Sequence, residues 1–269
     1  MSRPEQIAPP EVFYNDSESF KYTNNSRVMK IQAQMTDRSL ELLNLNNTSD
    51  LFLIDVGCGS GLSGEILTER GFQWVGLDIS PSMLANGLDK EVEGDLFLSD
   101  IGNGIPFRAG TFDAGISISA IQWLCNADSS NADPKKRLLR FFNTLYSSLK
   151  RGGKFVAQFY PLNDNQIEQI TSSAKTAGFQ GGIIVDDPES KKNKKHYLVL
   201  TAGVSERQIN LKGVTIEQKN ENSKLKSKSK RQVETRKEYI NRKKELMTKR
   251  GKKVANDSKF TARKRRPKF

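Results

Sequence analysis

Residues that often carry catalysis or hold small folds together are scarce in this sequence. Its 269 residues include two cysteines, Cys58 and Cys125, and a single histidine, His196. Two cysteines without paired spacing support neither a disulfide framework nor a zinc site, so a reducing compartment is expected. His196 lies between a lysine-rich loop and an apolar run, a position more typical of a strand edge than of a catalytic base.

Long apolar runs are also missing. No stretch approaches the roughly 20 residues of a membrane span, and the polar N-terminus does not have the pattern of a signal peptide. We therefore expect a soluble intracellular protein that does not enter a membrane.

Acidic and basic residues are distributed unevenly. Residues 1–205 contain 20 Lys and Arg against 24 Asp and Glu, whereas residues 206–269 contain 23 against 7. The overall net charge of +12 therefore comes from the last quarter of the chain. Such asymmetry predicts a polyanionic partner that is contacted mainly by a basic tail.

The most informative stretch is Leu-Ile-Asp-Val-Gly-Cys-Gly-Ser-Gly at residues 53–61. The apolar run predicts a buried strand, and the alternating glycines let the backbone turn sharply and come close to a ligand. A helix-compatible segment follows. In a doubly wound α/β fold, this order of strand, glycine turn and helix builds a nucleotide-type pocket at the strand ends.

Strand and helix patterns alternate from residue 51 onward. Strands are expected at 51–56, 74–78, 95–98, 112–119 and 154–159, and helices at 61–70, 134–149 and 166–177, with a turn at 150–153. Ser80 and Pro81 predict the N-cap and first residue of another helix. Two further strands at 182–185 and 197–200 are joined by a loop too short for a crossover helix, so they must pair antiparallel. Five parallel strands plus a terminal antiparallel hairpin form the seven-stranded α/β sheet of class I methyltransferases.

The chain divides into three expected parts. Residues 1–45 form an N-terminal segment with a helical period at 27–45, and residues 46–203 form the methyltransferase domain. The helix either packs on the sheet or belongs to a flap over the cofactor, with Tyr14 and Tyr22 among the tyrosines of its inner face. Residues 204–269 are too polar to offset their ordering entropy. We expect this tail to be disordered alone, although a basic helix over 230–250 could form on a partner.

Three features favour S-adenosylmethionine as the ligand of the glycine turn. The spacing of the glycines is tighter than in dehydrogenases, Asp78 ends the second strand where ribose hydroxyls would lie, and Asp100 and Ile101 follow the third strand where an adenine ring would be read. One such acid alone could be a solvated loop residue, but acids that end consecutive strands after a glycine turn favour a role in binding. The expected cofactor-binding residues are Asp55, Gly57, Gly59, Gly61, Asp78, Ile79, Asp100, Ile101, Ser117 and Arg27.

Two of these residues have alternative interpretations. Asp55 ends the first strand, where a carboxylate would offset the positive charge of the cofactor and orient the glycine turn; a purely structural role is the alternative. Arg27 could pair with the cofactor's carboxylate as a bidentate fork, or it could simply be solvated.

Aromatic residues follow the fourth and fifth strands, where the acceptor should approach. Trp123, Phe159 and Tyr160 could stack on a planar base, at roughly 1–3 kcal/mol per contact. The alternative for Trp123 is a place in the core.

Several blocks together resemble the eukaryotic small-subunit (18S) ribosomal RNA guanine-N7 methyltransferases, most of all the fungal members. Gln-Trp-Leu-Cys-Asn at 122–126 and Asp-Asp-Pro-Glu-Ser at 186–190 are more specific than the glycine turn. The matching blocks are residues 9–16, 55–64, 76–84, 94–98, 116–126, 154–161, 186–195 and 264–266. The resemblance covers essentially the whole chain.

The resemblance implies methylation of N7 of one guanine in 18S rRNA, a role in small-subunit biogenesis on the pre-40S particle, and residence in the nucleus and cytoplasm. It also implies a heterodimer with a small zinc-binding activator, which adds a strand to the third strand of the sheet, here Asp95, Leu96, Phe97 and Leu98. No metal is expected in this chain. An apolar edge of this kind is an aggregation hazard unless it is covered.

A guanine N7 carries a lone pair and no proton, so alignment of the reactants does most of the work and no general base is expected. The basic run at 259–268 could be a nuclear import signal, a phosphate clamp or a solvated tail. Two other functions stay open: a small-molecule methyltransferase, and a ribosome-assembly factor whose presence matters more than its catalysis.

Overall fold

The computed structural model describes residues 3–45, 50–126, 133–190, 193–203, 236–249 and 253–256. By its internal contacts the chain separates into two units, Met1–Asn210 and Leu211–Phe269. The first unit holds the sheet and the helices that pack on it.

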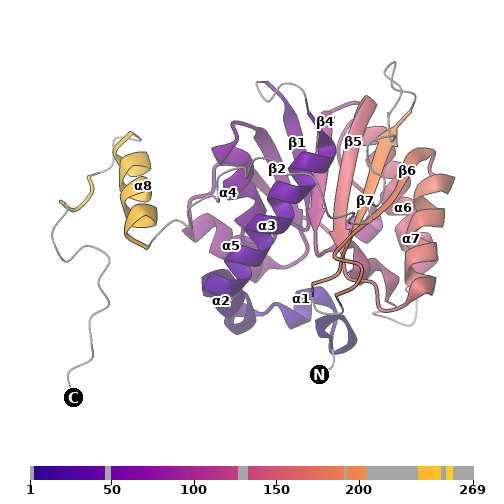
Figure 1. Cartoon of the computed structure of the whole chain (residues 1–269), viewed down its shortest axis with the longest axis horizontal. Coiled ribbons are helices and arrows are strands. Elements are labelled where there is room, and N and C mark those ends of the chain that lie inside the picture. Colours follow the sequence, from indigo (N-terminus) through magenta and orange to yellow (C-terminus); the bar gives the residue numbers. More distant parts are fainter. Residues whose placement is uncertain are drawn as a thin grey trace, which may run out of the picture. The chain divides into compact units, whose positions relative to one another are not determined.

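Seven strands of the described residues form one sheet in the order β3-β2-β1-β4-β5-β7-β6 (Figure 1). Strands β1 to β5 run parallel, and β7 pairs antiparallel with both β5 and β6. The predicted sheet with its terminal hairpin is therefore confirmed. The strands are β1 Phe52–Val56, β2 Gln73–Asp78, β3 Asp95–Leu98, β4 Phe112–Ile118, β5 Leu149–Phe159, β6 Phe179–Asp186 and β7 Lys195–Ala202.

Helices cover both faces of the sheet and bury two apolar cores. On one face α3 (Ser26–Leu43) and α4 (Leu62–Glu69) contribute Met35, Leu43 and Leu67, and Figure 1 shows α3 crossing the central strands. On the other face α6 (Pro134–Ser148) and α7 (Asp164–Thr176) contribute residues such as Phe141 and Ile170. A parallel sheet needs this cover because its strands are apolar on both sides.

The remaining helices described in this unit have nine residues or fewer. Helix α5 (Pro81–Asp89) begins as predicted, with Ser80 as N-cap accepting a hydrogen bond from Met83 N and Pro81 as its first residue. The other elements are η1 Pro4–Gln6, α1 Pro10–Phe13, α2 Asp16–Asn24, η2 Ile101–Asn103 and η3 Ile121–Cys125. The helix predicted at 27–45 is confirmed as α3.

One local prediction is wrong. Residues 150–153 were expected to form a turn before the fifth strand, but they lie inside β5. The reason is a register shift: Phe112 pairs with Leu149 and Ala114 with Lys154, so β5 takes more residues than its partner over the same stretch. The extra residues form a bulge that continues the strand.

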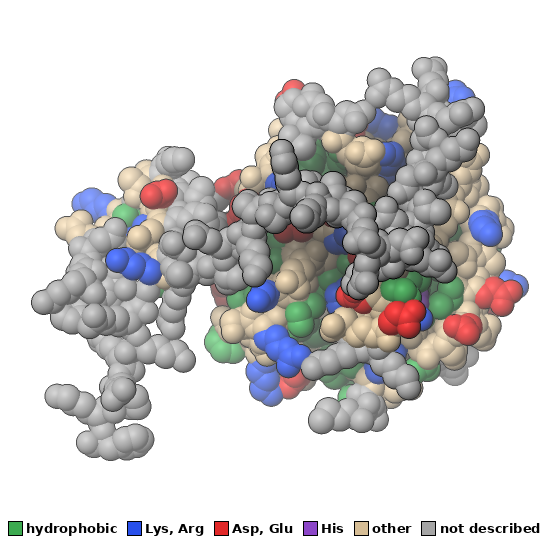
Figure 2. All heavy atoms as spheres, viewed as in Figure 1, with side chains coloured by type: hydrophobic (Ala, Val, Ile, Leu, Met, Phe, Trp, Pro, Cys, Tyr) green, Lys and Arg blue, Asp and Glu red, His purple; other side chains and the backbone are tan. Residues whose placement is uncertain are grey.

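The second unit contains α8, Arg236–Lys249. It lies within the stretch for which a basic helix was predicted, and lysine side chains of this unit are visible in blue in Figure 2. The rest of the tail, including the basic run at 259–268, lies largely outside the described residues. Over the part of the chain that the structure describes, no helix has the length and apolar character of a membrane span.

Candidate functional site

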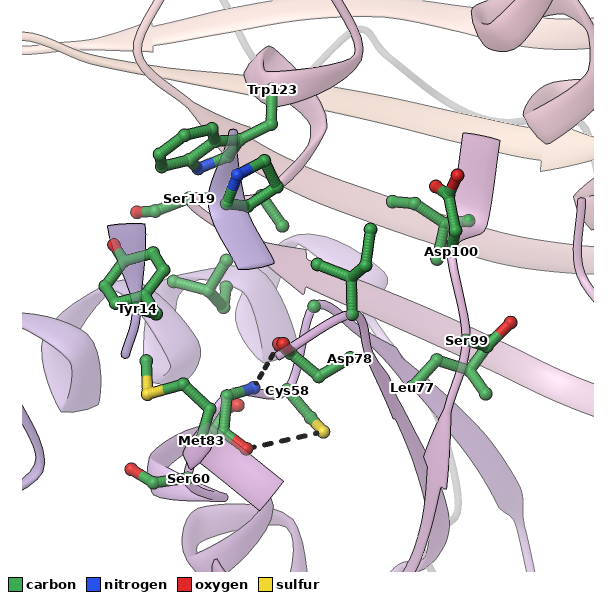
Figure 3. Close-up of a pocket in the computed structure, with 18 of the residues that line it drawn as sticks. Tyr14, Cys58, Ser60, Leu77, Asp78, Met83, Ser99, Asp100, Ser119 and Trp123 are labelled. Carbon is green, nitrogen blue, oxygen red and sulfur yellow. Dashed lines mark hydrogen bonds between the residues drawn. The ribbon is translucent and has the colours of Figure 1, made fainter. Parts of the chain in front are cut away.

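A cleft of about 860 Å³, including space open to solvent, lies at the carboxyl ends of the strands. Ligand sites of doubly wound sheets lie in this place. Segments that follow β1, β2, β3 and β4 line it, and the N-terminal helices add further side chains (Figure 3). Of the predicted cofactor residues, those that line the cleft are Gly57, Gly59, Asp78, Ile79, Asp100 and Ile101.

Two glycines of the turn, Gly57 and Gly61, have no room for a side chain. Gly57 has a φ of +73°, and a Cβ on it would lie 2.2 Å from the Cβ of Ala120. Gly61 has a φ of +76°, and its Cβ would lie 2.8 Å from Val92. Only glycine adopts this left-handed backbone without strain, so both positions depend on it.

Asp78 is placed between the turn and the next helix. Its carboxylate accepts hydrogen bonds from Gly59 N and Ser80 N, each at 2.8 Å. Burial raises the pKa of the Asp78 carboxyl, and the backbone N–H groups oppose that effect. Each carboxylate oxygen keeps a second lone pair for a ligand, so Asp78 both fixes the turn and can accept from hydroxyl groups.

Asp100 forms the far wall of the cleft in Figure 3. Its carboxylate caps η2 through Gly102 N at 2.8 Å and is paired with the guanidinium of Arg137, also at 2.8 Å. Both side chains of the pair are mostly buried, with 20% and 26% of their surface exposed. Arg137 lines the cleft from α6, a contribution that the local sequence around 137 does not indicate.

Aromatic side chains form the opposite wall. Tyr14 and Trp123 have ring centroids 5.9 Å apart, and Tyr14 meets Tyr22 edge-on at 5.7 Å. All three line the cleft, so the tyrosines of the N-terminal segment do face inward. Burial raises the pKa of both tyrosine hydroxyls well above the usual range, so they stay neutral.

Four predicted cofactor residues are not brought into the cleft lining. A Cβ added to Gly61 would point at Val92, and Arg27 is exposed on α3. Ser117 is fully buried, where its hydroxyl donates to the carbonyl of Val56 at 2.8 Å. Asp55 lies beneath the turn and is also fully buried.

Asp55 has an unusual environment. Ser63 Oγ donates to its Oδ2 at 2.5 Å, while Oδ1 has no hydrogen-bond partner among the described residues. Burial raises the pKa of this carboxyl to about 7. This geometry suits the structural alternative, in which the side chain supports the turn from below.

The three residues that were expected to stack on a base lie in three different environments. Trp123 lines the cleft, but Phe159 is fully buried and packs on His196 in β7, 5.8 Å between ring centroids. Tyr160 lines a smaller hollow beside the cleft, of about 230 Å³ including space open to solvent, together with Glu5 and Gln122. The three side chains therefore do not form one platform.

Ser119 lines the cleft without having been predicted. It follows β4 with a φ of +59°, a strained value for a residue with a side chain. Its hydroxyl donates to Gln158 Oε1 at 2.7 Å. Strained residues concentrate at functional sites, but no local pattern in the sequence marks this one.

Groups suited to metal binding or nucleophilic attack are few. Over the described ranges, no three His, Cys, Asp or Glu side chains gather in a way that could hold a metal ion. Cys58 lines the cleft, but burial raises the pKa of its thiol well above the usual value, so it stays protonated.

Known protein families match two parts of the chain. A family described as a methyltransferase domain matches residues 54–157, and one described as a methyltransferase involved in Williams-Beuren syndrome matches residues 187–267. A solved Haemonchus contortus phosphoethanolamine N-methyltransferase 2, in complex with S-adenosyl-L-methionine, has a TM-score of 0.55 at 18% identity. It covers 76% of this chain and 61% of its own length, which shows the shared methyltransferase fold.

Curated relatives match over the full length. The 18S rRNA (guanine(1575)-N(7))-methyltransferase of Saccharomyces cerevisiae is 65% identical over 277 residues, covering 100% of both chains. The 18S rRNA (guanine-N(7))-methyltransferase of Mus musculus is 47% identical and covers 99% of this chain and 98% of its own. The resemblance seen in the sequence blocks is thereby confirmed, and the chain belongs to the family of 18S rRNA guanine-N7 methyltransferases.

Proposed function

We propose that this protein transfers a methyl group from S-adenosylmethionine to N7 of a guanine in 18S rRNA. The observation that carries the proposal is the full-length similarity to enzymes named for that reaction. The cleft at the strand ends supports it, because its position and lining suit a nucleoside-type cofactor.

The residues of the cleft fit the cofactor. The turn at Gly57 and Gly59 lines the cleft with backbone, and at Gly57 a side chain would clash with Ala120, 2.2 Å from an added Cβ. Asp78 would accept hydrogen bonds from the ribose hydroxyls, and Asp100 with Ile101 would contact the adenine. Bound there, S-adenosylmethionine supplies an electrophilic methyl group on a sulfonium.

The chain's own contribution is placement and exclusion of water. The lone pair of guanine N7 carries no proton, so nothing has to be removed before it reacts. This agrees with a cleft whose phenols and thiol are held neutral by burial. Alignment of two bound reactants alone can supply several kcal/mol, about 7–11 in the best model systems. Tyr14, Tyr22 and Trp123 would close the aromatic wall against solvent.

The edge of β3 is the proposed docking site for the zinc-binding activator. Strand β3 pairs with β2 alone among the described residues, which leaves its outer hydrogen-bonding groups available. Phe97 and Leu98 on this strand are 44% and 62% exposed, and Leu88 of the adjacent α5 is 67% exposed. A strand added by the partner would cover this apolar edge.

Contact with 18S rRNA within the pre-40S particle, and residence in the nucleus and cytoplasm, complete the proposal. The basic residues after 206 supply the charge for RNA contact. The division at residues 45 and 203 assigns RNA contact to the tail, the cofactor to residues 46–203 and the cover of the cofactor to residues 1–45.

Labelled methyl transfer tests the activity. The full chain, with and without the activator, is incubated with labelled S-adenosylmethionine and small subunits that lack the mark, and the labelled base is mapped by cleavage at N7-methylated guanines. We expect one labelled guanine in 18S rRNA and more product with the activator. Label in a small metabolite alone would reject the proposal.

A charged substitution tests the docking site. Leu98→Lys should abolish co-purification with the activator, because a lysine replaces the exposed apolar side chain at the edge. Leu162→Lys is the matched control, since Leu162 is 47% exposed away from β3. Equal retention of the activator by both variants would place the interface elsewhere.

A further inference from the structure

A partly buried polar cluster joins the N-terminal segment to η3, which follows β4 next to the cleft. Gln122 Nε2 donates to Glu5 Oε1 at 2.9 Å and to the carbonyl of Ser119 at 2.8 Å. Asn126 Nδ2 donates to the carbonyl of Glu5 at 3.0 Å. These contacts fix the Glu5 carboxylate against η3.

The cluster leaves two acceptors without a donor. Both amide hydrogens of Gln122 are used by acceptors, so Oε1 is the atom of this amide that is left to accept. Gln122 Oε1 and Glu5 Oε2 are buried and have no hydrogen-bond partner among the described residues. Gln122 is only 4% exposed, and leaving such acceptors unpaired is costly. Gln158 Nε2 is also without a partner but does not line the hollow.

Both acceptors belong to side chains that line the hollow of about 230 Å³ beside Tyr160. The hollow adjoins the cleft, because Gln122 lines one and the next residue, Trp123, lines the other. The guanidinium of Arg3 donates to the carbonyls of Tyr160 and Pro161 at 3.0 and 2.9 Å and closes the far end.

A ligand that pairs both acceptors must present two donor groups. Among the four RNA bases, only guanine has two adjacent donor groups, N1–H and the N2 amino group, on its Watson–Crick edge. Adenine and cytosine have an amino donor next to a ring acceptor, and uracil has one donor between two acceptors. Extruded bases are commonly read on this edge and stacked on aromatic rings.

We propose that Glu5 and Gln122 read the Watson–Crick edge of the acceptor guanine, with Tyr160 beside its ring. The inference rests on the proposed guanine-N7 activity and names the residues that choose the base. N7 lies on the Hoogsteen edge of guanine and not on the Watson–Crick edge, so a base held by N1 and N2 in the hollow leaves N7 free. These are specificity residues, distinct from those that would hold the cofactor.

Replacing the acceptor guanosine by inosine tests the inference. Inosine keeps N7 and N1–H but lacks the N2 amino group. Small-subunit rRNA is ligated to carry guanosine or inosine at the methylated position, and initial rates are measured with the full chain and its activator. The proteins are wild type, Glu5→Gln, Glu5→Ala and the control Glu11→Gln, which makes the same change at an exposed glutamate of the same segment.

We expect wild type and Glu11→Gln to prefer guanosine by about 10- to 100-fold, as a lost hydrogen bond to a charged group implies. Glu5→Ala should bring the preference close to one, and Glu5→Gln should give an intermediate value. Cofactor affinity, measured by calorimetry, should stay at the wild-type value in all four.

Two results would overturn this inference and leave the proposed function intact. One is a wild-type preference for guanosine close to one; the other is Glu5 variants that methylate both RNAs equally more slowly and keep the wild-type ratio of rates. The second result would mean that Glu5 only anchors the N-terminal segment. Failure of wild type to methylate either RNA would instead reject the proposed function, and the inference with it.

Discussion

The two sides of the cleft are held by contacts of very different range along the chain. On the proposed cofactor side, meaning the turn at 57–61 with Asp78 and Asp100, Gly59 N and Asp78 are 19 residues apart and Gly102 N and Asp100 are two apart. On the proposed acceptor side, meaning Glu5, Ser119, Gln122 and Tyr160, Glu5 and Gln122 are 117 residues apart. Arg3 and Tyr160 are 157 apart.

This difference has a physical consequence. The cofactor side forms as soon as neighbouring strands pair, because its groups belong to consecutive strand ends. The acceptor side exists only after the N-terminal segment has docked across β4 and β5. We therefore expect the two sides to respond separately to substitution.

The largest effect is expected at Gly57. Gly57→Ala places a Cβ 2.2 Å from Ala120 and strains a backbone with a φ of +73°. Cofactor affinity should fall at least about 100-fold, because relief of the clash must move the turn. Calorimetric titration with S-adenosylmethionine measures it.

Gly110→Ala is the matched control for that change. Gly110 has a φ of +67° but nothing within 4 Å of an added Cβ, so it carries the backbone strain without the clash. It should cost about 1–2 kcal/mol of stability and leave the affinity unchanged. Equal loss of affinity in both variants would contradict the account of the turn.

A pH-dependent effect is expected at Asp55, beneath the cofactor side. Its folded pKa of about 7 lies above the ordinary value of 3.8, so the unfolded chain releases the proton first. The free energy of unfolding of wild type should therefore fall between about pH 4 and pH 7, by at most about 1.4 kcal/mol per unit from this group, and level off above. Asp55→Asn has no carboxyl at this position, so its stability lacks this contribution to the pH dependence.

Urea unfolding of both proteins at several pH values measures this effect. The stability of Asp55→Asn relative to wild type should rise across the same window and stay constant above pH 7. Parallel curves for the two proteins would show that the Asp55 carboxyl keeps its ordinary pKa in the folded chain.

A smaller effect is expected at Arg3, which fastens the acceptor side. Arg3→Ala removes two hydrogen bonds to the carbonyls of Tyr160 and Pro161, worth about 1 kcal/mol together at an exposed site. The catalytic efficiency toward RNA should fall about five-fold at unchanged cofactor affinity. Arg27→Ala, an exposed arginine of the same segment, is the control. A weakened cofactor affinity in Arg3→Ala would show that the acceptor side and the cofactor side are coupled, contrary to the expectation that they respond separately.

The smallest effect is expected at Ser119. Both Ser119→Ala and Ser119→Gly lose the hydrogen bond to Gln158, but only glycine relaxes the φ of +59°. The glycine variant should be more stable than the alanine variant by about 1 kcal/mol, measured by chemical denaturation. The reverse order would mean that the backbone at Ser119 is not strained.

The same difference in range explains what could be predicted from the sequence. The sheet, the hairpin and the strand-end acids follow from local patterns and short spacings. Glu5 and Gln122 could not be connected, because no local pattern links residues that meet only in the folded chain. The strain at Ser119 likewise depends on the packing of β4 against its neighbours.

Two predicted site residues lie outside the cleft lining, and the sequence carried a signal for their placement. Phe159 is two residues after Ala157 and four after Phe155 in β5, and all three side chains belong to one core. Because successive strand residues point to opposite faces, Tyr160 lies on the other face of the sheet. Arg27 is out of phase with Gln32 and the other buried positions of α3, which agrees with its exposure on the outer face.

One calorimetric comparison tests the separation of the two sides most directly. S-adenosylmethionine is titrated into full-length Gly57→Ala and Glu5→Ala, each with the activator, and the same samples are assayed on guanosine and inosine RNA. We predict that Gly57→Ala loses cofactor binding, whereas Glu5→Ala binds the cofactor like wild type and loses the preference for guanosine. Loss of cofactor binding in Glu5→Ala comparable to that in Gly57→Ala would contradict the account.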